Sequence, residues 1–202
     1  MFLISPFYSY LPLRIKTNRM NFKPFPEIKS ERLLLRRMKE SDCEEILFLR
    51  SDKNINIYIE RPESRKIRSI SDAEKMIKNL DTSIEANESI AWGISLKNEP
   101  QLIGTIGIRN FSKNPKTAEV GYDLNPKFQR KGIMNEALKM IIHFSFKELK
   151  LDQIEAFTHS DNKASRKLLE KNGFQLQEKR KDLDYPSNIV FELENSSKYP
   201  FD

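Results

Sequence analysis

The segment FQRKGIMNEAL, residues 128–138, decides the fold of this chain. It follows the β-rich residues 117–124 and precedes apolar residues at helical spacing, which is typical of a turn that leads from a strand into a helix. The first N–H groups of a helix have no partner within the helix, and the helix dipole adds positive charge at the same end. The segment therefore predicts a binding site for a phosphate or pyrophosphate of a nucleotide-like ligand.

A second strand-to-helix turn lies downstream. The β-rich residues 153–158 lead to Asn162-Lys163-Ala164-Ser165, and the helix that follows ends at Asn172-Gly173-Phe174. One glycine between basic residues is often no more than a turn. Two successive turns of this kind bring two helix N-termini to the same end of a sheet, where α/β proteins bind ligands.

These motifs, in this order, resemble the GNAT N-acetyltransferase superfamily, and within it the branch that acetylates the N-termini of ribosomal proteins. The resemblance covers roughly residues 22–194. It implies an α/β (α+β) fold with a mixed, mostly antiparallel, splayed sheet flanked by helices. Ser30-Glu31-Arg32-Leu33-Leu34-Leu35-Arg36 is similar to the first strand of that branch.

The family's loop pattern Gln/Arg-x-x-Gly-x-Gly/Ala binds the pyrophosphate of acetyl-CoA, and residues 129–134 stand in its place. Met134 departs from the general Gly/Ala, although methionine is familiar there in the ribosomal-protein branch. The backbone of Asp123 and Leu124 would pair with the pantetheine amides, so that acetyl-CoA acts as an added strand. The cofactor-binding residues implied by the resemblance are Asp123, Leu124, Gln129, Arg130, Lys131, Gly132, Ile133, Met134, Asn135 and Asn162.

The resemblance also implies catalytic roles for Ser165, Glu119 and Asn162. Ser165 would donate a hydrogen bond to the leaving thiolate; the alternative is ordinary capping of the helix near Lys163, a role equally natural for Asp161 or Asn162. Asn162 would order the cofactor arm. Glu119 is the candidate general base, and a solvent-facing strand carboxylate is the equally weighted alternative.

For several further candidate site residues, an ordinary structural role is the alternative to a functional one. His159 can share the role of base, although a histidine facing a turn is the favoured interpretation. Tyr122 and Tyr185 are either acids or pocket walls, or packing residues of β-rich segments. The polar connection 51–68 is expected to set acceptor identity. The acceptor-pocket candidates are Tyr58, Arg61 and Trp92, the last with core packing as its alternative.

Charge and composition limit the class of partner. The chain has 202 residues, of which 38% are hydrophobic and 32% charged, as in a globular protein able to bury a full core. A net charge of +6 favours acidic partners such as CoA or nucleic acid. The charges are scattered, and no RNA-type aromatic motif is present, so direct nucleic-acid binding is not expected. The spacing of Lys163, Lys167 and Lys171 predicts either a contact to the 3′-phosphate or a solvated helix face.

Cysteine and histidine content argues against metal and disulfide chemistry. Cys43 is the only cysteine, which excludes an intramolecular disulfide and favours a structural thiol. His143 and His159 lack paired spacing, so no metal is expected. The apolar stretch 1–13 contains prolines, lacks a basic start and is too short to span a bilayer. We expect a loose extension at 1–19, one N-acetyltransferase domain at 20–202, a cytoplasmic location and no membrane.

Hydrophobic periodicity predicts the elements along the chain. Strands are expected at 32–37, 90–96, 102–109, 116–124, 153–158, 174–180 and 188–194, and helices at 42–50, 71–85, 132–149 and 163–171. The strands between 90 and 124 would form an antiparallel meander. Ser71-Asp72-Ala73-Glu74 is similar to a capping box.

The predicted function is acetyl-CoA-dependent transfer of an acetyl group to a primary amine, by direct attack in a ternary complex. The favoured acceptor is a protein N-terminus. A small-molecule amine acetyltransferase, acting on an amino sugar or polyamine, and a non-catalytic acyl-CoA sensor are the alternatives. The presence of Gly132, Asn162 and Ser165 favours catalysis. The chain is expected to be a monomer or a homodimer.

Overall fold

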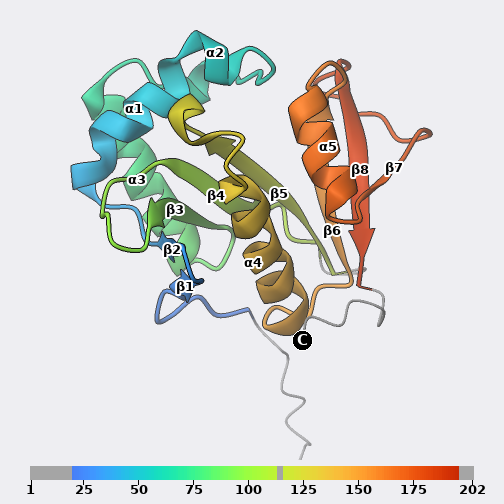
Figure 1. The fold of residues 1–202 in the computed structure, drawn as a ribbon, viewed down its shortest axis with the longest axis horizontal. Helices are drawn as coiled ribbons and strands as arrows, with labels where there is room; N and C mark the ends of the chain where they lie inside the picture. Colours follow the sequence, from blue (N-terminus) through green and yellow to red (C-terminus); the bar gives the residue numbers. More distant parts are fainter. Residues whose placement is uncertain (1–19, 113–115, 196–202) are drawn as a thin grey trace, which may run out of the picture.

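The computed structural model describes residues 20–112 and 116–195. The predicted loose extension, residues 1–19, lies outside the described residues. Within these described ranges, eight strands form one sheet in the order β1-β2-β3-β4-β5-β6-β8-β7 (Figure 1). Their bounds are β1 Ile28–Lys29, β2 Leu33–Arg36, β3 Ile90–Leu96, β4 Gly104–Arg109, β5 Thr117–Leu124, β6 Gln153–His159, β7 Gln175–Leu176 and β8 Asn188–Glu194.

All neighbouring strands are antiparallel except β5 and β6, which run parallel. The prediction of a mixed, mostly antiparallel sheet is confirmed, as is the meander of β3, β4 and β5. β7 is only two residues long, whereas a strand at 174–180 was predicted. The chain turns away after it, and Arg180 forms ion pairs with Glu155 of β6 and Glu192 of β8.

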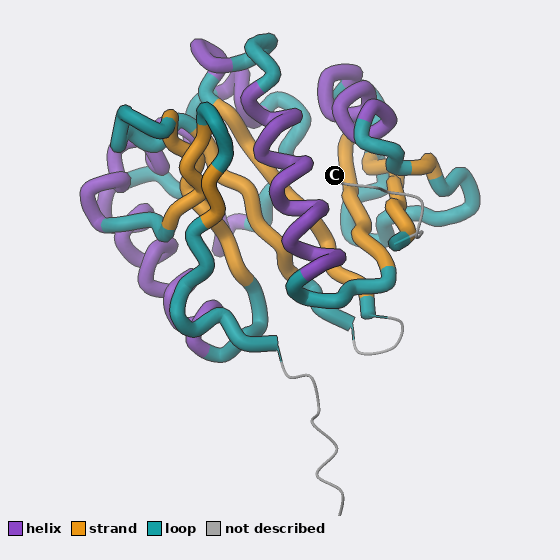
Figure 2. Tube along the Cα trace, turned by 60° about the horizontal axis from the view of Figure 1, so that its bottom comes forward, coloured by secondary structure: helices purple, strands orange, loops and turns teal. Residues whose placement is uncertain are grey.

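Helices cover both faces of the sheet (Figures 1 and 2). The α-helices of the described residues are α1 Cys43–Ser51, α2 Lys53–Asn56, α3 Ile70–Glu85, α4 Ile133–Lys147 and α5 Lys163–Lys171. Short 3-10 helices are η1 Glu40–Asp42, η2 Glu63–Arg65 and η3 Pro126–Phe128. α4 packs on one face in a large apolar cluster, and α1 and α3 pack on the other face in a second cluster. Helix α3 begins at Ile70, because Ser69 rather than Ser71 accepts the capping hydrogen bond from the amide of Asp72.

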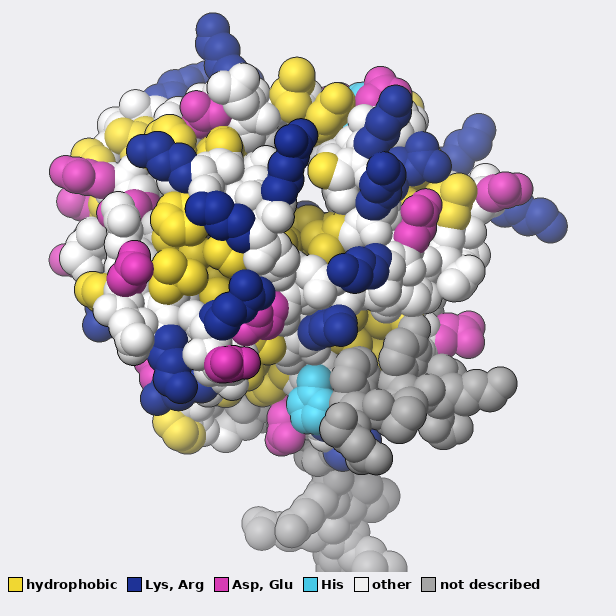
Figure 3. All heavy atoms as spheres, viewed as in Figure 1, with side chains coloured by type: hydrophobic (Ala, Val, Ile, Leu, Met, Phe, Trp, Pro, Cys, Tyr) yellow, Lys and Arg dark blue, Asp and Glu magenta, His cyan; other side chains and the backbone are white. Residues whose placement is uncertain are grey.

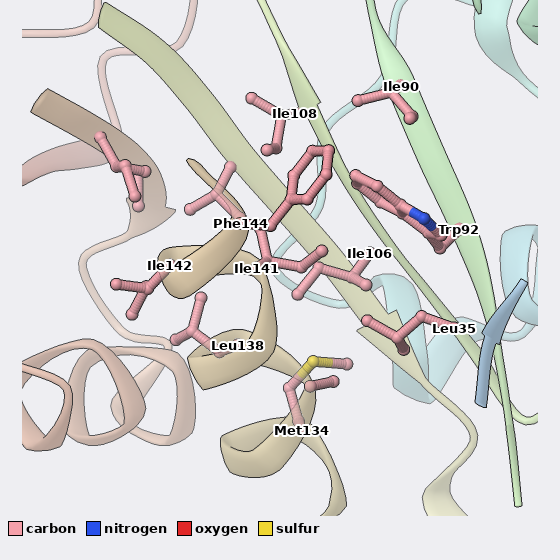
Figure 4. Packing of buried hydrophobic residues seen from close by; sticks show 14 of the residues in the cluster. Leu35, Ile90, Trp92, Ile106, Ile108, Met134, Leu138, Ile141, Ile142 and Phe144 are labelled. Atoms are coloured by element: carbon pink, nitrogen blue, oxygen red, sulfur yellow. The ribbon is translucent and has the colours of Figure 1, made fainter. Parts of the chain in front are cut away.

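Trp92 lies at the centre of the cluster beneath α4 (Figure 4). Its side chain is fully buried, its ring packs edge-on against Phe144 at 5.3 Å, and its indole N–H donates to the carbonyl of Pro26 at 2.7 Å. Of the two interpretations of Trp92, core packing is therefore confirmed and the acceptor-pocket candidate is wrong. A large aromatic ring at the middle of a central strand is buried by the helix that crosses it, and its one polar group is satisfied within the core.

Cys43 is also buried, at the start of α1, and burial raises the pKa of its thiol. A buried thiol whose charged form is disfavoured is a poor nucleophile. Cys43 therefore serves as a packing residue in the apolar cluster that α1 and α3 share.

Candidate active site

Strands β5 and β6 separate partway along their length. They pair only between Thr117–Glu119 and Gln153–Glu155, while the other edge of β5 stays paired with β4 as far as Leu124. Figures 1 and 2 show the two strands diverging beyond this point, with α4 packed over β5 and α5 beside β6. From Val120 onward, the edge of β5 facing β6 has no strand partner within the described chain. A ligand with amide groups can bind such an edge as an added strand.

A loop rich in free backbone donors follows the open half of β5. Arg130 and Gly132 both adopt left-handed conformations, with φ of 60° and 76°. Within residues 20–112 and 116–195, the amide N–H groups of residues 130–135 donate to no protein acceptor. Six consecutive free donors at the N-terminus of a 15-residue helix form a favourable site for a doubly or triply charged phosphate group.

Two residues near β2 hold this loop in place. Ser30 Oγ donates to Glu136 Oε1 at 2.6 Å, and Arg32 Nε donates to Glu136 Oε2 at 2.7 Å. Arg32 also donates to the carbonyl of Lys131. Burial opposes ionisation of Glu136, but these hydrogen bonds outweigh it and lower the pKa of the carboxyl below its ordinary value. Sequence reasoning missed Glu136, whose only signal was an acidic residue in the first helical turn.

The remaining loop residues have distinct environments. Gln129 donates from its side-chain amide to the carbonyl of Leu124 at 3.1 Å, which ties the loop to the end of β5. Ile133 and Met134 are buried in the core beneath α4, and Figure 4 shows the thioether of Met134 among the other apolar side chains. The side chain that replaces the family's Gly/Ala therefore points away from the free amides.

Helix α5 meets the open half of β5 through Ser165. Asn162 caps the helix, since its Oδ1 accepts from the amide of Ser165 at 3.0 Å. The hydroxyl of Ser165 is instead hydrogen-bonded to the hydroxyl of Tyr122 on β5, at 2.9 Å. Burial raises the pKa of Tyr122 to about 12, against the opposing effect of Ser165. Both hydroxyls are thus neutral near pH 7 and can donate hydrogen bonds.

A second contact joins the region of α5 to the start of α4. Asn172, just after α5, donates from Nδ2 to Asn135 Oδ1 at 3.1 Å and to the carbonyl of Leu168 at 2.8 Å. Its own Oδ1 is buried and has no partner in the part of the chain that the structure describes. The side chain of Asn135, predicted as a cofactor contact, is therefore turned toward α5, and its backbone amide is the group left for a ligand.

Figure 3 shows a hollow on this face of the molecule, between α4 and α5. Hydrophobic side chains form its floor, and Lys and Arg side chains gather around it. Lys163, Lys167 and Lys171 of α5 are all exposed, and no ion pair involves them among the residues described. Such a setting suits a ligand with an apolar arm and an anionic end.

The opposite face of β5 carries a different set of side chains, because successive residues of a strand alternate between faces. Glu119, Gly121 and Asp123 lie on this face. A Cβ built on Gly121 would meet nothing within 4 Å, so the strand is open there. Glu119 is only 9% exposed and accepts hydrogen bonds from Arg109 and Asn110. The alternative of a solvent-facing carboxylate is therefore wrong.

Asp123 uses its backbone and its side chain for different contacts. Its backbone lies on the open half of β5, where the predicted pairing with pantetheine would take place. Its buried carboxylate accepts from Thr105 Oγ1 at 2.8 Å and lies 2.6 Å from Arg50 Nη1 and 3.8 Å from Arg61 Nη2. Sequence reasoning missed Arg50, which joins α1 to the sheet at this position.

Two residues predicted near the acceptor lie against each other. The rings of Tyr58 and His159 are 5.4 Å apart, which brings the connection 51–68 to the end of β6. His159 Nδ1 accepts from the amide of Asp161 at 3.1 Å, in accordance with a turn-facing histidine. Tyr185 lies in a separate turn, in which its backbone amide donates a hydrogen bond to the carboxylate of Asp182.

Residues 32–175 match the family described as the acetyltransferase (GNAT) domain. The chain is a GNAT acetyltransferase. The uncharacterized N-acetyltransferase YoaA of Bacillus subtilis (strain 168) is 32% identical over 151 residues, which cover 75% of this chain and 84% of YoaA. Named N-acetyltransferases among its relatives agree with an enzyme that transfers an acetyl group.

Solved structures share this GNAT fold. The ribosomal-protein-S5-alanine acetyltransferase from Vibrio fischeri is 25% identical with a TM-score of 0.73, covering 87% of this chain and 100% of that one. RimL, a ribosomal L7/L12 alpha-N-protein acetyltransferase in complex with coenzyme A, is 20% identical with a TM-score of 0.73, covering 84% and 98%. In this GNAT chain, no helix of the described residues is long and apolar enough to cross a membrane.

Proposed function

We propose that this N-acetyltransferase uses acetyl-CoA to acetylate the N-terminal amine of a protein. The observation that carries the proposal is the divergence of β5 from β6, with six free amides at residues 130–135 beside it. The amides would bind the pyrophosphate, and the open edge at 120–124 would pair with pantetheine. This arrangement would direct the thioester toward Tyr122 and Ser165.

The acceptor amine would approach from the face of β5 on which Gly121 lies open. The neutral amine attacks the thioester carbonyl, the new C–N bond forms, and the C–S bond breaks. Ser165, hydrogen-bonded to Tyr122, would donate a hydrogen bond that stabilises the departing thiolate, which then takes a proton from water. Glu119 would accept the proton that the amine loses, through water, while Arg109 and Asn110 hold its carboxylate in place.

A protein acceptor is supported by the relatives that act on ribosomal proteins and by the open approach over Gly121. An acceptor of that kind would place the reaction in the cytoplasm. A small-molecule amine is the second candidate, because the compact cavity beside Arg50 and Arg61 has the size of a small-molecule site, although its cations disfavour a polycation such as a polyamine.

An acceptor screen tests the proposed acceptor. We expect labelled acetyl-CoA to modify peptides that begin with alanine or serine, with little transfer to amino sugars or polyamines. Turnover of the amines alone would replace the proposal with a small-molecule acetyltransferase. Intact CoA binding without turnover of any acceptor would indicate an acyl-CoA sensor.

The exposed cations of the loop are expected to add only modestly to cofactor binding. Arg130 and Lys131 are exposed, and the backbone amides need neither side chain. Changing both residues to Gln should weaken acetyl-CoA binding by about 1 kcal/mol and flatten its salt dependence. Calorimetric titration with CoA at two ionic strengths measures both effects.

The matched control is the double change of Lys139 and Lys147 to Gln. These two lysines are exposed on α4 but lie beyond its first turn, so the control removes the same charge without altering the loop. Equal effects of the two double variants would mean that only overall charge matters. Loss of acceptor binding with unchanged CoA binding would show that the loop does not bind the cofactor.

A further inference from the structure

A cavity of about 420 Å³ opens between the end of α1, α2 and the segment that leads to α3. Arg50, Arg61, Lys66 and Arg68 are among the eight residues that line it, and none of the eight is acidic. A cavity lined by four cations attracts anions, because low-dielectric walls focus the field of the charges.

The deepest part of this cavity has more positive than negative charge. The side chains of Arg50 and Arg61 are 21% and 14% exposed, and they share the single carboxylate of Asp123. Arg61 lies beyond hydrogen-bond distance of that carboxylate, and burial, together with repulsion by Arg50, lowers the pKa of Arg61 to about 10. The only side-chain hydrogen bond of Arg61 to the described residues goes from Nη1 to Asn56. Its Nε and Nη2 donors remain for a ligand.

The rim of the cavity does not neutralise this charge. Lys66 and Arg68 both pair with Glu63, which is 68% exposed. Four cations therefore face two carboxylates, those of Asp123 and Glu63. An oxyanion with two acceptor atoms matches the planar donors of an arginine and offsets the charge that the protein leaves unpaired.

The cavity lies close to the proposed approach of the acceptor. Asp123, which holds Arg50 and Arg61, follows Gly121 by two residues on the same face of β5. Two residues of a strand span about 7 Å. An extended peptide whose amine lies over Gly121 would thus bring the side chain of its second or third residue to the cavity.

We propose that this cavity binds an oxyanion of the acceptor, the carboxylate or phosphate of a side chain near the N-terminus, and so selects acidic peptide N-termini. The proposal rests on the proposed function, since it assumes a peptide acceptor over Gly121. Neutral and basic N-termini are acetylated less efficiently because they give Arg61 no hydrogen-bonded anion, and the ion pair with Asp123 at 3.8 Å is its only anionic contact among the described residues.

Matched peptides test the proposal with the intact enzyme. The probes begin with serine and carry Asp, phosphoserine, Asn or Lys at the second or third position. We expect a KM for the Asp peptides about tenfold below that for the Asn peptides, with similar kcat, as for one charge-assisted hydrogen bond. A lower KM for phosphoserine than for Asp would identify phosphate as the better ligand, and the reverse order a carboxylate.

Arg61→Gln should raise the KM for Asp peptides about tenfold and leave that for Asn peptides unchanged. Arg65→Gln is the control, because Arg65 is exposed in the same segment and does not line the cavity. Lys66→Gln, at the rim, should reproduce the loss of selectivity in part and guards against misfolding of the Arg61 variant. Acetylation of the Asp and Asn peptides with equal KM would overturn the proposed selection of acidic N-termini but leave the proposed peptide acceptor intact. Failure to acetylate any peptide would overturn the proposed acceptor, and this inference with it.

Discussion

Replacement of Gly132 by valine is expected to raise the dissociation constant of acetyl-CoA at least about tenfold in a protein that remains folded. Gly132 has a φ of 76°, which a β-branched residue adopts only with strain of about 1–3 kcal/mol. A Cβ at this position would make only an ordinary contact, 3.6 Å from Arg32. We therefore expect the effect to arise because the backbone moves and the free amides of residues 130–135 no longer point toward one phosphate group. Calorimetric titration measures the affinity, and thermal unfolding confirms the fold.

Gly132→Asn is the matched control for conformation. Asparagine tolerates the left-handed region far better than valine, so this variant should retain most of the affinity despite its larger side chain. If the two variants weaken binding equally, bulk rather than backbone conformation is responsible. Unchanged affinity in the valine variant would exclude the loop as the pyrophosphate site.

Replacement of Ser165 by alanine is expected to lower kcat about 100-fold, the ordinary contribution of one hydrogen bond to a charge that develops in the transition state, while acetyl-CoA affinity changes little. The hydroxyl of Ser165 is bonded to Tyr122, and the cap of α5 is supplied by Asn162. Removal of the hydroxyl should therefore leave the melting temperature nearly unchanged. Steady-state kinetics, CoA titration and thermal unfolding together measure the three quantities.

Asn162→Ala separates catalysis from helix capping. It removes the Oδ1 that accepts from the Ser165 amide and should cost about 1 kcal/mol of stability. Tyr122→Phe should share part of the kcat loss of the Ser165 variant, because it removes the partner of that hydroxyl. A Ser165 variant with normal kcat and a lowered melting temperature would show that Ser165 is only a structural residue.

The features that depend on neighbouring residues could be predicted from the sequence. The strand that ends at Leu124, the turn at Gly132 and the apolar spacing of α4 follow one another along the chain, so their order is visible as a pattern. The meander of β3, β4 and β5 was predictable because short connections join adjacent antiparallel strands. Element ends were less accurate, as the start of α3 shows, because Ser69 and Ser71 are both plausible caps by residue type.

The sequence by itself determined the order of strands and helices, the strand-to-helix turns and the GNAT resemblance, since each depends on residue types at short spacing. Only the tertiary structure decided which distant residues meet. Arg32 binds Glu136 although 104 positions separate them in the sequence. Asp123 of β5 forms ion pairs with Arg50 of α1 and with Arg61 of the connection 51–68. The tertiary structure also decided between the two alternatives for Trp92, core and acceptor pocket, because Phe144 of α4 packs against its ring. Spacing along a chain says which face of an element a residue occupies, whereas the element packed against that face depends on the whole core.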